Sequence, residues 1–486
     1  MRPAAAHAVA LLAGVAAVGG FSPVDLFPLT LLALAALAHL WIRAGTPRAG
    51  FVSGFLFGLG FFLAGVSWVY VSLQRFGGMP VPLAAFATGA FCAFLAFFPA
   101  LAGWAQAKLP GPGPRLAAIP ALWTLAEWLR GSILTGFPWL PAGNAALDSP
   151  LAGFAPLGGA YLLSFLTMGA AVLLWMLAAH HRRWFAAGAF AALGAAGAGL
   201  QTVEWTAPAG PPVSVSLLQG NVPQSLKFEP GRYERTLETY GRLADASRAR
   251  LIVLPETALP RFLDLVDPAY LARLRAVAER NGGDLLLGVP RRTGPDTYLN
   301  SVVTLGVSPR GAYDKVHLVP FGEFVPPGFG WVLSVLRIPL SDFARGAPDQ
   351  APLAAAGERV AVNVCYEDAF GAEIAARVKD ATLLVNVSNV AWFGDSLAPG
   401  QHLQIARLRA LETGRDYLTA TNTGVTAVVG AHGRVRARLP QFAEGRLDAE
   451  AQGRTGVTPY VRFGDLPVLL LALAVLALVA LRSRSR

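Results

Sequence analysis

Val360-Ala361-Val362-Asn363-Val364-Cys365-Tyr366-Glu367-Asp368 is the stretch of the chain that decides its fold. The apolar run from Val360 predicts a buried strand, and the polar residues after Cys365 predict a turn that leads into a helix. A cysteine at such a junction points outward beside backbone N–H groups, as in a nucleophile elbow. By itself, however, a cysteine after an apolar strand is more commonly a small buried hydrophobic residue.

The same kind of pattern extends over residues 206–460, where short β-like runs bounded by turn residues alternate with helical periodicity. The predicted strands are 213–219, 251–254, 285–289, 301–305, 360–364, 382–387 and 426–430, and the predicted helices are 232–248, 268–281, 372–378 and 402–415. Strands that alternate with helices indicate an α/β layered domain, and this stretch is long enough for one.

The rest of the chain is too apolar for an ordinary soluble protein. The 486 residues are 54% hydrophobic and 14% charged, whereas soluble domains carry about 25% charged residues. Residues 1–205 are therefore predicted to form transmembrane helices 1–7, and residues 461–486 the last transmembrane helix with a basic tail. The eight candidate spans are 4–20, 26–42, 51–73, 81–107, 116–130, 152–178, 184–202 and 466–481.

The net charge of +10 is explained by the positions of the basic residues rather than by nucleic-acid binding. With both chain ends inside, the short outside loops carry only Arg75 and Arg130, so the positive-inside rule places residues 203–465 outside. A cleaved signal peptide at residues 1–20 is the alternative to an uncleaved first helix, which we favour. The basic residues of the inside segments are Arg2, Arg43, Arg48, Lys108, Arg115, Arg182, Arg183, Arg482, Arg484 and Arg486.

The chain has two cysteines, Cys92 in an apolar span and Cys365 in the outer domain. This topology places them in different compartments, which argues against a disulfide between them and against a cysteine metal site. A single free thiol on the oxidising side of a membrane is unusual enough to indicate a function.

Residues 320–345 form an irregular stretch that is rich in apolar side chains. A long loop in a compact domain is usually functional or disordered. One interpretation is a buried core segment. We favour the other, an arm that dips into the bilayer surface and admits lipid, because the domain is tethered to the membrane at both ends. The apolar residues of this arm are Phe321, Phe324, Val325, Phe329, Trp331, Val332, Leu333, Val335 and Leu336.

Two further patterns accompany the cysteine. In Leu254-Pro255-Glu256 a predicted strand ends at a carboxylate, and strand ends are where ligand sites gather in α/β folds. The second is Tyr313-Asp314-Lys315-Val316-His317-Leu318-Val319-Pro320-Phe321-Gly322-Glu323, which opens the arm. Each of these has an ordinary structural explanation when taken alone, such as a capping carboxylate or a surface lysine.

Together, Glu256, Lys315 and Cys365 resemble the catalytic triad of the nitrilase (carbon–nitrogen hydrolase) superfamily. Longer strings resemble the apolipoprotein N-acyltransferase family over nearly the whole chain. These strings are 219–227 (QGNVPQSLK), 315–326 (KVHLVPFGEFVP), 388–394 (SNVAWFG), 401–404 (QHLQ) and 458–460 (TPY). The resemblance implies an αββα sandwich outside a bundle of about eight spans in the bacterial inner membrane. Two positions depart from the family pattern, with Phe228 where tryptophan is common and Val390 where aspartate is common.

The resemblance also implies a ping-pong reaction. A phospholipid acylates Cys365, and the α-amino group of a diacylglyceryl apolipoprotein then takes the acyl group. We assign Glu256 as the general base with a pKa raised by burial, and Lys315 with the N–H of Tyr366 as donors to the oxyanion. Supporting roles fall to Glu323, Tyr366 and Glu367, and substrate contacts to Phe228, Phe321, Phe324, Trp331 and Trp392.

No cofactor or metal is expected, because His317 and His402 have no partner at ligand spacing. We expect the chain to act as a monomer. Two competing interpretations are a membrane-tethered amidase that uses the same triad and a catalytically silent scaffold. The apolar arm and the spans argue against the amidase, and the intact triad argues against the scaffold.

Overall fold

A computed structural model describes residues 2–227, 230–326, 328 and 342–484. The chain divides into two compact units. The first contains residues 1–70, 81–204 and 463–486, and the second contains residues 71–80 and 205–462.

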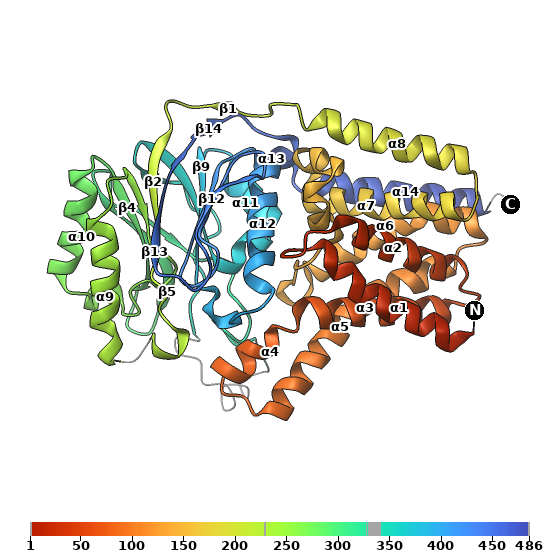
Figure 1. The fold of residues 1–486 in the computed structure, drawn as a ribbon, viewed down its shortest axis with the longest axis horizontal. Helices are drawn as coiled ribbons and strands as arrows, with labels where there is room; N and C mark the ends of the chain where they lie inside the picture. The colour runs from red at the N-terminus through yellow and green to blue at the C-terminus, as the bar shows by residue number, and fades with distance from the viewer. Residues whose placement is uncertain (1, 228–229, 327, 329–341, 485–486) are drawn as a thin grey trace. The chain divides into compact units, whose positions relative to one another are not determined.

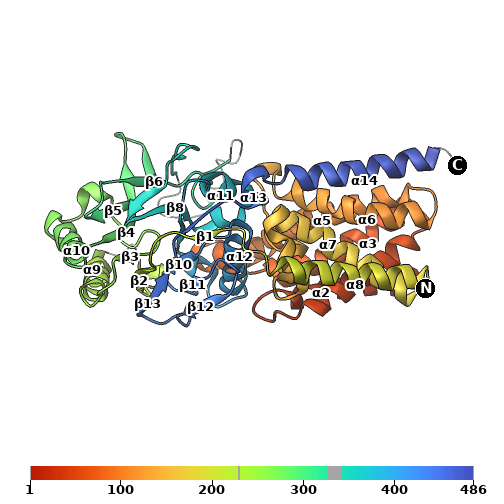
Figure 2. The ribbon, with the colours of Figure 1, turned by 90° about the horizontal axis from the view of Figure 1, so that it is seen from above.

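The first unit is a bundle of apolar helices that run alongside one another (Figures 1 and 2). Each of the eight predicted spans overlaps a helix, but five helical segments among the described residues meet the length and composition needed to cross a membrane. The number of spans therefore stays a prediction. The long helices are α1 Pro3–Ala17, α2 Phe27–Ile42, α3 Pro47–Val66, α5 Val81–Ala107, α6 Pro112–Arg130, α7 Ala155–Ala178, α8 Arg183–Leu200 and α14 Leu466–Arg484.

The predicted carboxyl-terminal end of one span was wrong. The expected helix over residues 51–73 stops with α3 at Val66, and is followed by a turn, α4 (Val69–Val71) and a π-helical turn at Ser72–Phe76. The turn residues Ser67 and Trp68 do not interrupt the apolar run of the sequence. A hydropathy pattern therefore cannot detect that the helix ends before them. Residues 71–80 pack with the second unit instead.

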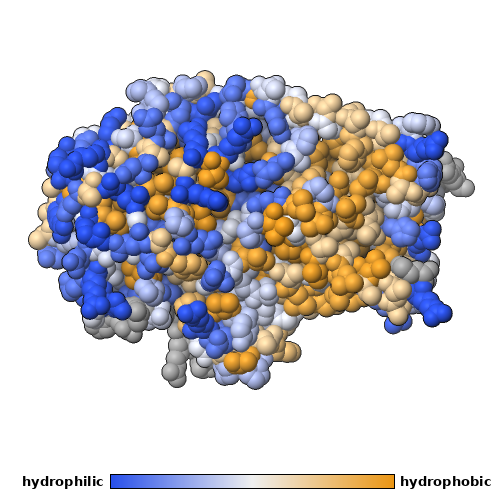
Figure 3. Space-filling model, in the orientation of Figure 1, coloured by the Kyte–Doolittle hydropathy of each residue, from blue (hydrophilic) through white to orange (hydrophobic). Residues whose placement is uncertain are grey.

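Small residues let α3 and α5 approach closely. A Cβ on Gly50 would lie 2.3 Å from the carbonyl oxygen of Gly103, and one on Gly54 would lie 2.4 Å from that of Pro99. Small residues four apart are typical of helices that pack by backbone contact in a membrane. In the space-filling view, apolar residues cover the exposed face of these helices, whereas hydrophilic residues dominate the surface of the second unit (Figure 3).

The second unit consists of two six-stranded sheets. One has the order β13-β2-β3-β4-β5-β6 and the other β12-β11-β10-β9-β8-β7. In each sheet three adjacent central strands are parallel: β2, β3 and β4 in the first, and β8, β9 and β10 in the second. The strands are β2 Val213–Gln219, β3 Leu251–Val253, β4 Asp284–Arg292, β5 Tyr298–Gly306, β6 Ala312–Asp314, β7 Leu353–Ala355, β8 Glu358–Val364, β9 Leu383–Ser388, β10 Tyr417–Thr421, β11 Ala427–Val429, β12 Val435–Arg438 and β13 Gly445–Ala451, with a separate pair β1 Ala207–Pro208 and β14 Arg454–Thr455.

Side chains that alternate along each strand build the layers. Leu251 and Val253 enter the core between the two sheets, whereas Ile252 packs outward on α9 (Pro230–Asp245) and α10 (Pro268–Arg280). In the second sheet, Leu384 packs outward in the same way, among residues of α11 (Gly371–Arg377) and α12 (Ala398–Thr413). Figure 1 shows both helical layers. The predicted αββα sandwich is therefore confirmed as the architecture of this unit.

All seven predicted strands overlap strands of the structure, and the four predicted helices overlap α9 to α12. Five strands of the two sheets were not predicted: β6, β7, β10, β12 and β13.

Candidate active site

The three residues of the predicted triad come from three strand ends of the second unit. Glu256 follows β3, Lys315 follows β6, and Cys365 follows β8. The carboxyl ends of parallel strands in an α/β fold are a common place for a reactive site. Lys315 is 1% exposed and Glu256 is 7% exposed, so their charges interact in a medium far less polarisable than water.

Lys315 binds two carboxylates. Its Nζ lies 2.8 Å from Oε2 of Glu323 and 3.4 Å from Oε1 of Glu256. Asn300 joins the same two groups, since its Nδ2 donates to Oε1 of Glu256 at 2.7 Å and to Oε1 of Glu323 at 2.9 Å. The main chain of Lys315 is fixed as well, because its N–H donates to the carbonyl oxygen of Asn300 at 2.8 Å. Glu323 therefore contacts Lys315 directly and is linked to Glu256 through Asn300.

Glu256 is held from a second side by the other sheet. The backbone N–H of Asn389, just after β9, donates to Oε2 of Glu256 at 2.8 Å. The main chain of Glu256 also packs closely on β4. A Cβ on Gly288 would lie 2.8 Å from the Cα of Glu256, so this position of β4 requires glycine. The next residue, Thr257, has a φ of +47°, which is strained for a β-branched residue.

The structure corrects one expectation about Glu256. Burial raises the pKa of this carboxyl group, but Lys315, the Asn300 amide, Lys227 and the Asn389 N–H lower it by more, and the resulting pKa is lowered. The sequence-based expectation of a raised pKa for Glu256 was wrong because it counted desolvation alone. Glu256 is therefore ionised and ready to accept a proton.

The other two triad members keep their protons in the resting site. Burial raises the pKa of the Cys365 thiol, and the neighbouring Glu256 carboxylate raises it further. Burial lowers the pKa of Lys315, but Glu323 and Glu256 raise it by more, so the net shift is upward. Lys315 is therefore a charged hydrogen-bond donor and cannot serve as the base.

Cys365 occupies a strained turn, as the elbow pattern predicted. Its φ is +53°, and it begins the 3-10 turn η9 (Cys365–Ala369). The Nδ2 of Asn386 donates to the carbonyl oxygen of Cys365 at 3.0 Å. Behind the turn, the fully enclosed pair of His402 and Asp368 (Nε2–Oδ2 3.0 Å) lies against the same carbonyl group, 3.4 Å from the histidine. Burial lowers the pKa of His402, but Asp368 raises it by more, so the net shift is upward.

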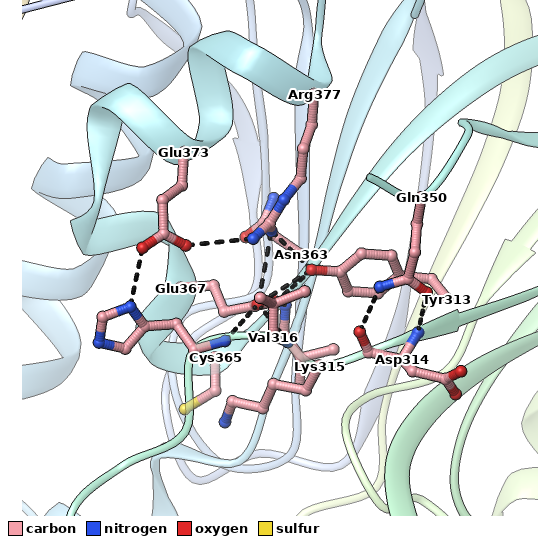
Figure 4. Close-up of polar contacts among 12 residues, drawn as sticks. Tyr313, Asp314, Lys315, Val316, Gln350, Asn363, Cys365, Glu367, Glu373 and Arg377 are labelled. Atoms are coloured by element: carbon pink, nitrogen blue, oxygen red, sulfur yellow. Dashed lines mark hydrogen bonds and ion pairs between the residues drawn. The ribbon is translucent and has the colours of Figure 1, made fainter. Parts of the chain in front are cut away.

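Glu367 lies behind the turn that carries Cys365 rather than beside the thiol. It is fully buried, and it joins the strand that ends at Cys365 to the loop that carries Lys315 (Figure 4). Figure 4 also shows the thiol and the lysine ammonium group pointing to the same side of this cluster. The donors to Glu367 are the N–H groups of Val316 (2.9 Å), His317 (3.1 Å) and Val364 (2.7 Å), the hydroxyl of Tyr313 (2.9 Å) and the guanidinium of Arg377 (3.4 Å).

The side chain of Tyr366 belongs to an aromatic cluster. Its ring centroid lies 5.1 Å from that of Phe370 and 6.0 Å from that of His317. His317 stacks on Phe370 at 3.6 Å and pairs with Glu373 through Nδ1 at 2.8 Å. Among the described residues, no group of three histidine, cysteine, aspartate or glutamate side chains could hold a metal ion.

The base of the predicted arm is tied to the site. The N–H of Phe343 donates to the carbonyl oxygen of Glu323 at 2.8 Å, and the N–H of Phe321 donates to that of Phe324 at 2.8 Å. The guanidinium of Arg345 lies 5.3 Å from the ring centroid of Phe324. The predicted contact residues Phe228 and Trp331 lie outside the described residues.

Trp392 contacts a segment that sequence analysis assigned to a membrane span and the loop after it. The hydroxyl of Ser72 donates to the carbonyl oxygen of Trp392 at 2.8 Å, and the ring of Phe76 meets the ring of Trp392 edge-on at 5.9 Å. The loop that these contacts hold begins at Asn389, whose N–H binds Glu256. The π-helical turn at Ser72–Phe76 thus supports the carboxylate of Glu256 indirectly.

This contact predicts a measurable effect of a residue far from Glu256 in sequence. Replacing Phe76 with alanine should lower the rate of Cys365 acylation by about 2–10-fold, because an aromatic pair contributes about 0.5–1.5 kcal/mol. The measurement is single-turnover acylation by a phospholipid. Phe86→Ala, which removes a 72% exposed ring from α5, is the matched control and should leave that rate unchanged. Equal rates for Phe76→Ala and wild type would contradict the prediction.

Sequence reasoning missed several residues that shape the site, among them Asn300, Asn389 and Lys227. Asn389 and Lys227 stand inside the strings 388–394 and 219–227, which carried the family resemblance. Asn300 stands in β5 with no local motif around it, and its role follows only from the pairing of β5 with β6.

Comparisons with known proteins agree with this geometry. Residues 13–173 match the model of the apolipoprotein N-acyltransferase N-terminal domain, and residues 214–460 match the carbon-nitrogen hydrolase model. The apolipoprotein N-acyltransferase of Nitrosomonas europaea is 50% identical over 478 residues, which cover 96% of this chain and 95% of that protein. That of Chromobacterium violaceum is 47% identical over 480 residues, which cover 97% and 93%.

Solved structures are more distant. The C. elegans NitFhit protein is 18% identical, with a TM-score of 0.40 over 52% of this chain and 63% of that one. Because the two curated relatives match nearly end to end and both domain models are present, the chain belongs to the apolipoprotein N-acyltransferase family, a family of acyltransferases with a carbon–nitrogen hydrolase domain.

Proposed function

We propose that the chain moves a fatty acyl group from a phospholipid to the α-amino group of an S-diacylglyceryl cysteine at the start of a lipoprotein, through a thioester on Cys365. The observation that carries this proposal is the meeting of a strained cysteine, an ionised Glu256 and a protonated Lys315 at three strand ends. Family membership supports the two substrates.

In the first half-reaction the sulfur of Cys365 attacks the ester carbonyl carbon of the phospholipid. Because the thiol pKa is raised and that of Glu256 is lowered, the proton moves to Glu256 as the S–C bond forms rather than before it. The negative charge that develops on the carbonyl oxygen is stabilised by Lys315 and by the N–H of Tyr366. The C–O bond then breaks, and the lysophospholipid leaves with the proton from Glu256.

In the second half-reaction the amine of the lipoprotein attacks the thioester. Glu256, ionised again, accepts a proton from the amine, and the tetrahedral intermediate forms against the same two donors. Thiolate is a better leaving group than an amine, so the intermediate collapses to the amide. Cys365 regains its proton from Glu256, and the site returns to its starting state.

The membrane accounts for transfer to an amine instead of water. A site that opens at the bilayer surface excludes water from the thioester and receives two lipid-anchored substrates. Most of the arm that the sequence predicts there, residues 327 and 329–341, lies outside the described residues. We place the second unit on the periplasmic face of the bacterial inner membrane, with eight spans and both chain ends inside, from the distribution of arginine and lysine. The acting species is a monomer in this proposal.

The test is intact mass spectrometry of the purified protein mixed with dipalmitoyl phosphatidylethanolamine. Wild type should gain the mass of one palmitoyl group, hydroxylamine should remove it, and Cys365→Ala should gain nothing. A dipalmitoylglyceryl-cysteine peptide with a free amine should then discharge the adduct, whereas the same peptide with an acetylated amine should not.

Three other outcomes would each favour a different mechanism. An enzyme that acylates the peptide without ever carrying an adduct on Cys365 would rule out the ping-pong route. An adduct that yields free palmitate at the same rate with either peptide would indicate a hydrolase. Release of ammonia from soluble amides, with no lipid adduct, would favour the amidase interpretation.

A further inference from the structure

Lysine is rare in this chain, which makes its buried lysines informative. Of the 40 basic residues, four are lysine: Lys108, Lys227, Lys315 and Lys379. Two of these four are buried beside Glu256, with Lys227 2% exposed and Lys315 1% exposed. A chain that uses arginine almost everywhere else therefore keeps two compact ammonium groups at its reactive centre.

Lys227 reaches the site from a third direction. It follows β2, in the segment that the string QGNVPQSLK spans, and its Nζ donates to the backbone carbonyl oxygen of Glu256 at 3.3 Å. Two asparagines anchor that segment. Asn422 exchanges hydrogen bonds with Val222 (2.8 and 2.9 Å), and the Nδ2 of Asn389 donates to Oε1 of Gln224 at 2.7 Å.

Asn389 therefore binds both the catalytic carboxylate and the lysine segment. Its backbone N–H holds Oε2 of Glu256, and its side chain holds Gln224, three residues before Lys227. A segment fixed in this way places the ammonium group of Lys227 with little conformational freedom, as a preorganised electrostatic group requires.

A count of the charges shows why a second cation is needed. Lys315 serves two carboxylates and lies closer to Glu323, at 2.8 Å, than to Glu256, at 3.4 Å. The three groups alone carry a net charge of −1, and a thiolate on Cys365 would add another negative charge in a buried space. With the ammonium group of Lys227 the resting site is neutral, which lowers the free energy of thiolate formation.

We propose that Lys227 is an electrostatic positioning residue of the active site, whose buried ammonium group balances the second carboxylate and supports the developing thiolate of Cys365. The inference rests on the proposed role of Cys365 as nucleophile. It assigns Lys227 no contact with the acyl group and no proton transfer.

The titration of Lys227 gives the proposal a signature in pH. Burial lowers the pKa of Lys227 to about 8, against opposing effects of Glu256 and Cys365. The lysine is therefore mostly charged at neutral pH and loses its charge, and its support for the thiolate, as the pH rises through about 8. The charged and titratable groups that face Lys227 or Cys365 are Glu256 after β3, Lys315 and Glu323 after β6, and Asp368 after β8, with His402 on α12 facing Glu256.

The experiment measures the reactivity of Cys365 without any lipid. Full-length protein in detergent is treated with iodoacetamide from pH 6 to 10, and alkylation of the peptide that contains Cys365 is followed by mass, apart from Cys92. Lys227→Met should lower the rate of alkylation below pH 8 by about tenfold or more, since a nearby opposite charge commonly shifts a pKa by about 1–3 units, and the two rates should converge as the pH rises above about 8. Lys379→Met removes an exposed lysine and should leave the profile at wild type.

A second variant tests whether the charge of the Lys227 side chain, rather than its volume, supports the activity. In acyl transfer, wild type should lose activity as the pH rises through about 8, whereas Lys227→Arg should keep its activity there because its side chain stays charged. A Lys227→Met profile that coincides with wild type would overturn the inference. A loss of activity at alkaline pH that persists in Lys227→Arg would also overturn the inference. This second result suffices by itself if Lys227→Met does not fold.

The result is independent of the proposed function. Alkylation requires no phospholipid, so a missing acyl adduct on wild type would count against the proposed function alone. An acyl adduct that forms normally, together with an unchanged alkylation profile in Lys227→Met, would count against the role of Lys227 alone.

Discussion

Replacing Glu256 with glutamine is expected to lower the rate at which a phospholipid acylates Cys365 by about 10²–10⁴-fold, the usual contribution of a positioned general base. Glutamine has nearly the same shape, and its amide oxygen can still accept the N–H of Asn389, as Oε2 of Glu256 does at 2.8 Å. The amide NH₂ then replaces Oε1, which accepts from Asn300 at 2.7 Å and lies 3.4 Å from Lys315, and the group that accepts the thiol proton is lost. Single-turnover acylation, followed by the mass of the thioester, measures this directly.

Glu323→Gln is the matched control, because Glu323 binds the same lysine at 2.8 Å and the same Asn300 amide at 2.9 Å. It removes an equal charge from the same site but no proton acceptor in the proposed reaction. Its loss of rate should be at least tenfold smaller than that of Glu256→Gln, given the range expected for a base. Equal losses in the two variants would mean that charge, not proton transfer, explains the effect of Glu256.

The three residues of the proposed triad could be selected from sequence because each stands at the end of a recognisable strand or in a long family string. Its electrostatics could not. The pKa of Glu256 depends on Asn300, Asn389 and Lys315, which lie 44, 133 and 59 positions away. No local pattern reports those contacts, so burial was counted and the compensating donors were not.

The missed strands have a similar cause. β13 reads Gly-Arg-Leu-Asp-Ala-Glu-Ala, a composition that favours helix as much as strand. It becomes a strand because all seven of its residues pair antiparallel with β2. β10 is buried throughout and directly follows a helix and its glycine cap. Pairing with β9 and β11 decides its conformation, and tertiary pairing of this kind overrides local propensity.

The helices of the first unit, in contrast to these strands, could be predicted from local composition. Apolar composition located every long helix of the first unit, because a span needs little more than length and hydropathy. It failed at the end of the predicted span 51–73, because α3 stops at Val66 and residues 71–80 belong to the second unit, where Ser72 and Phe76 pack on Trp392. The failure falls at a segment that supports the active site.

Removal of Glu367 should have the largest effect on stability. Glu367→Ala leaves the buried N–H groups of Val364 and Val316 without an acceptor and Arg377, 3.4 Å away, without its buried partner. Breaking a buried ion pair costs about 3–5 kcal/mol, which corresponds to a fall of about 6–20 °C in the melting temperature of a domain of this size. Thermal unfolding of the full chain in detergent measures it.

Glu373→Ala is the control, since Glu373 binds the same Arg377 at 3.1 Å from a side chain that is 34% exposed. A partly exposed pair contributes about 0–1 kcal/mol, so this variant should unfold close to the wild-type temperature. Glu367→Gln should be nearly as unstable as Glu367→Ala. Both carboxylate oxygens accept only, and an amide NH₂ would face the donors of Val364, Val316 or Tyr313. A glutamine variant as stable as wild type would show that the hydrogen bonds to Glu367 do not join the Cys365 turn to the Lys315 loop.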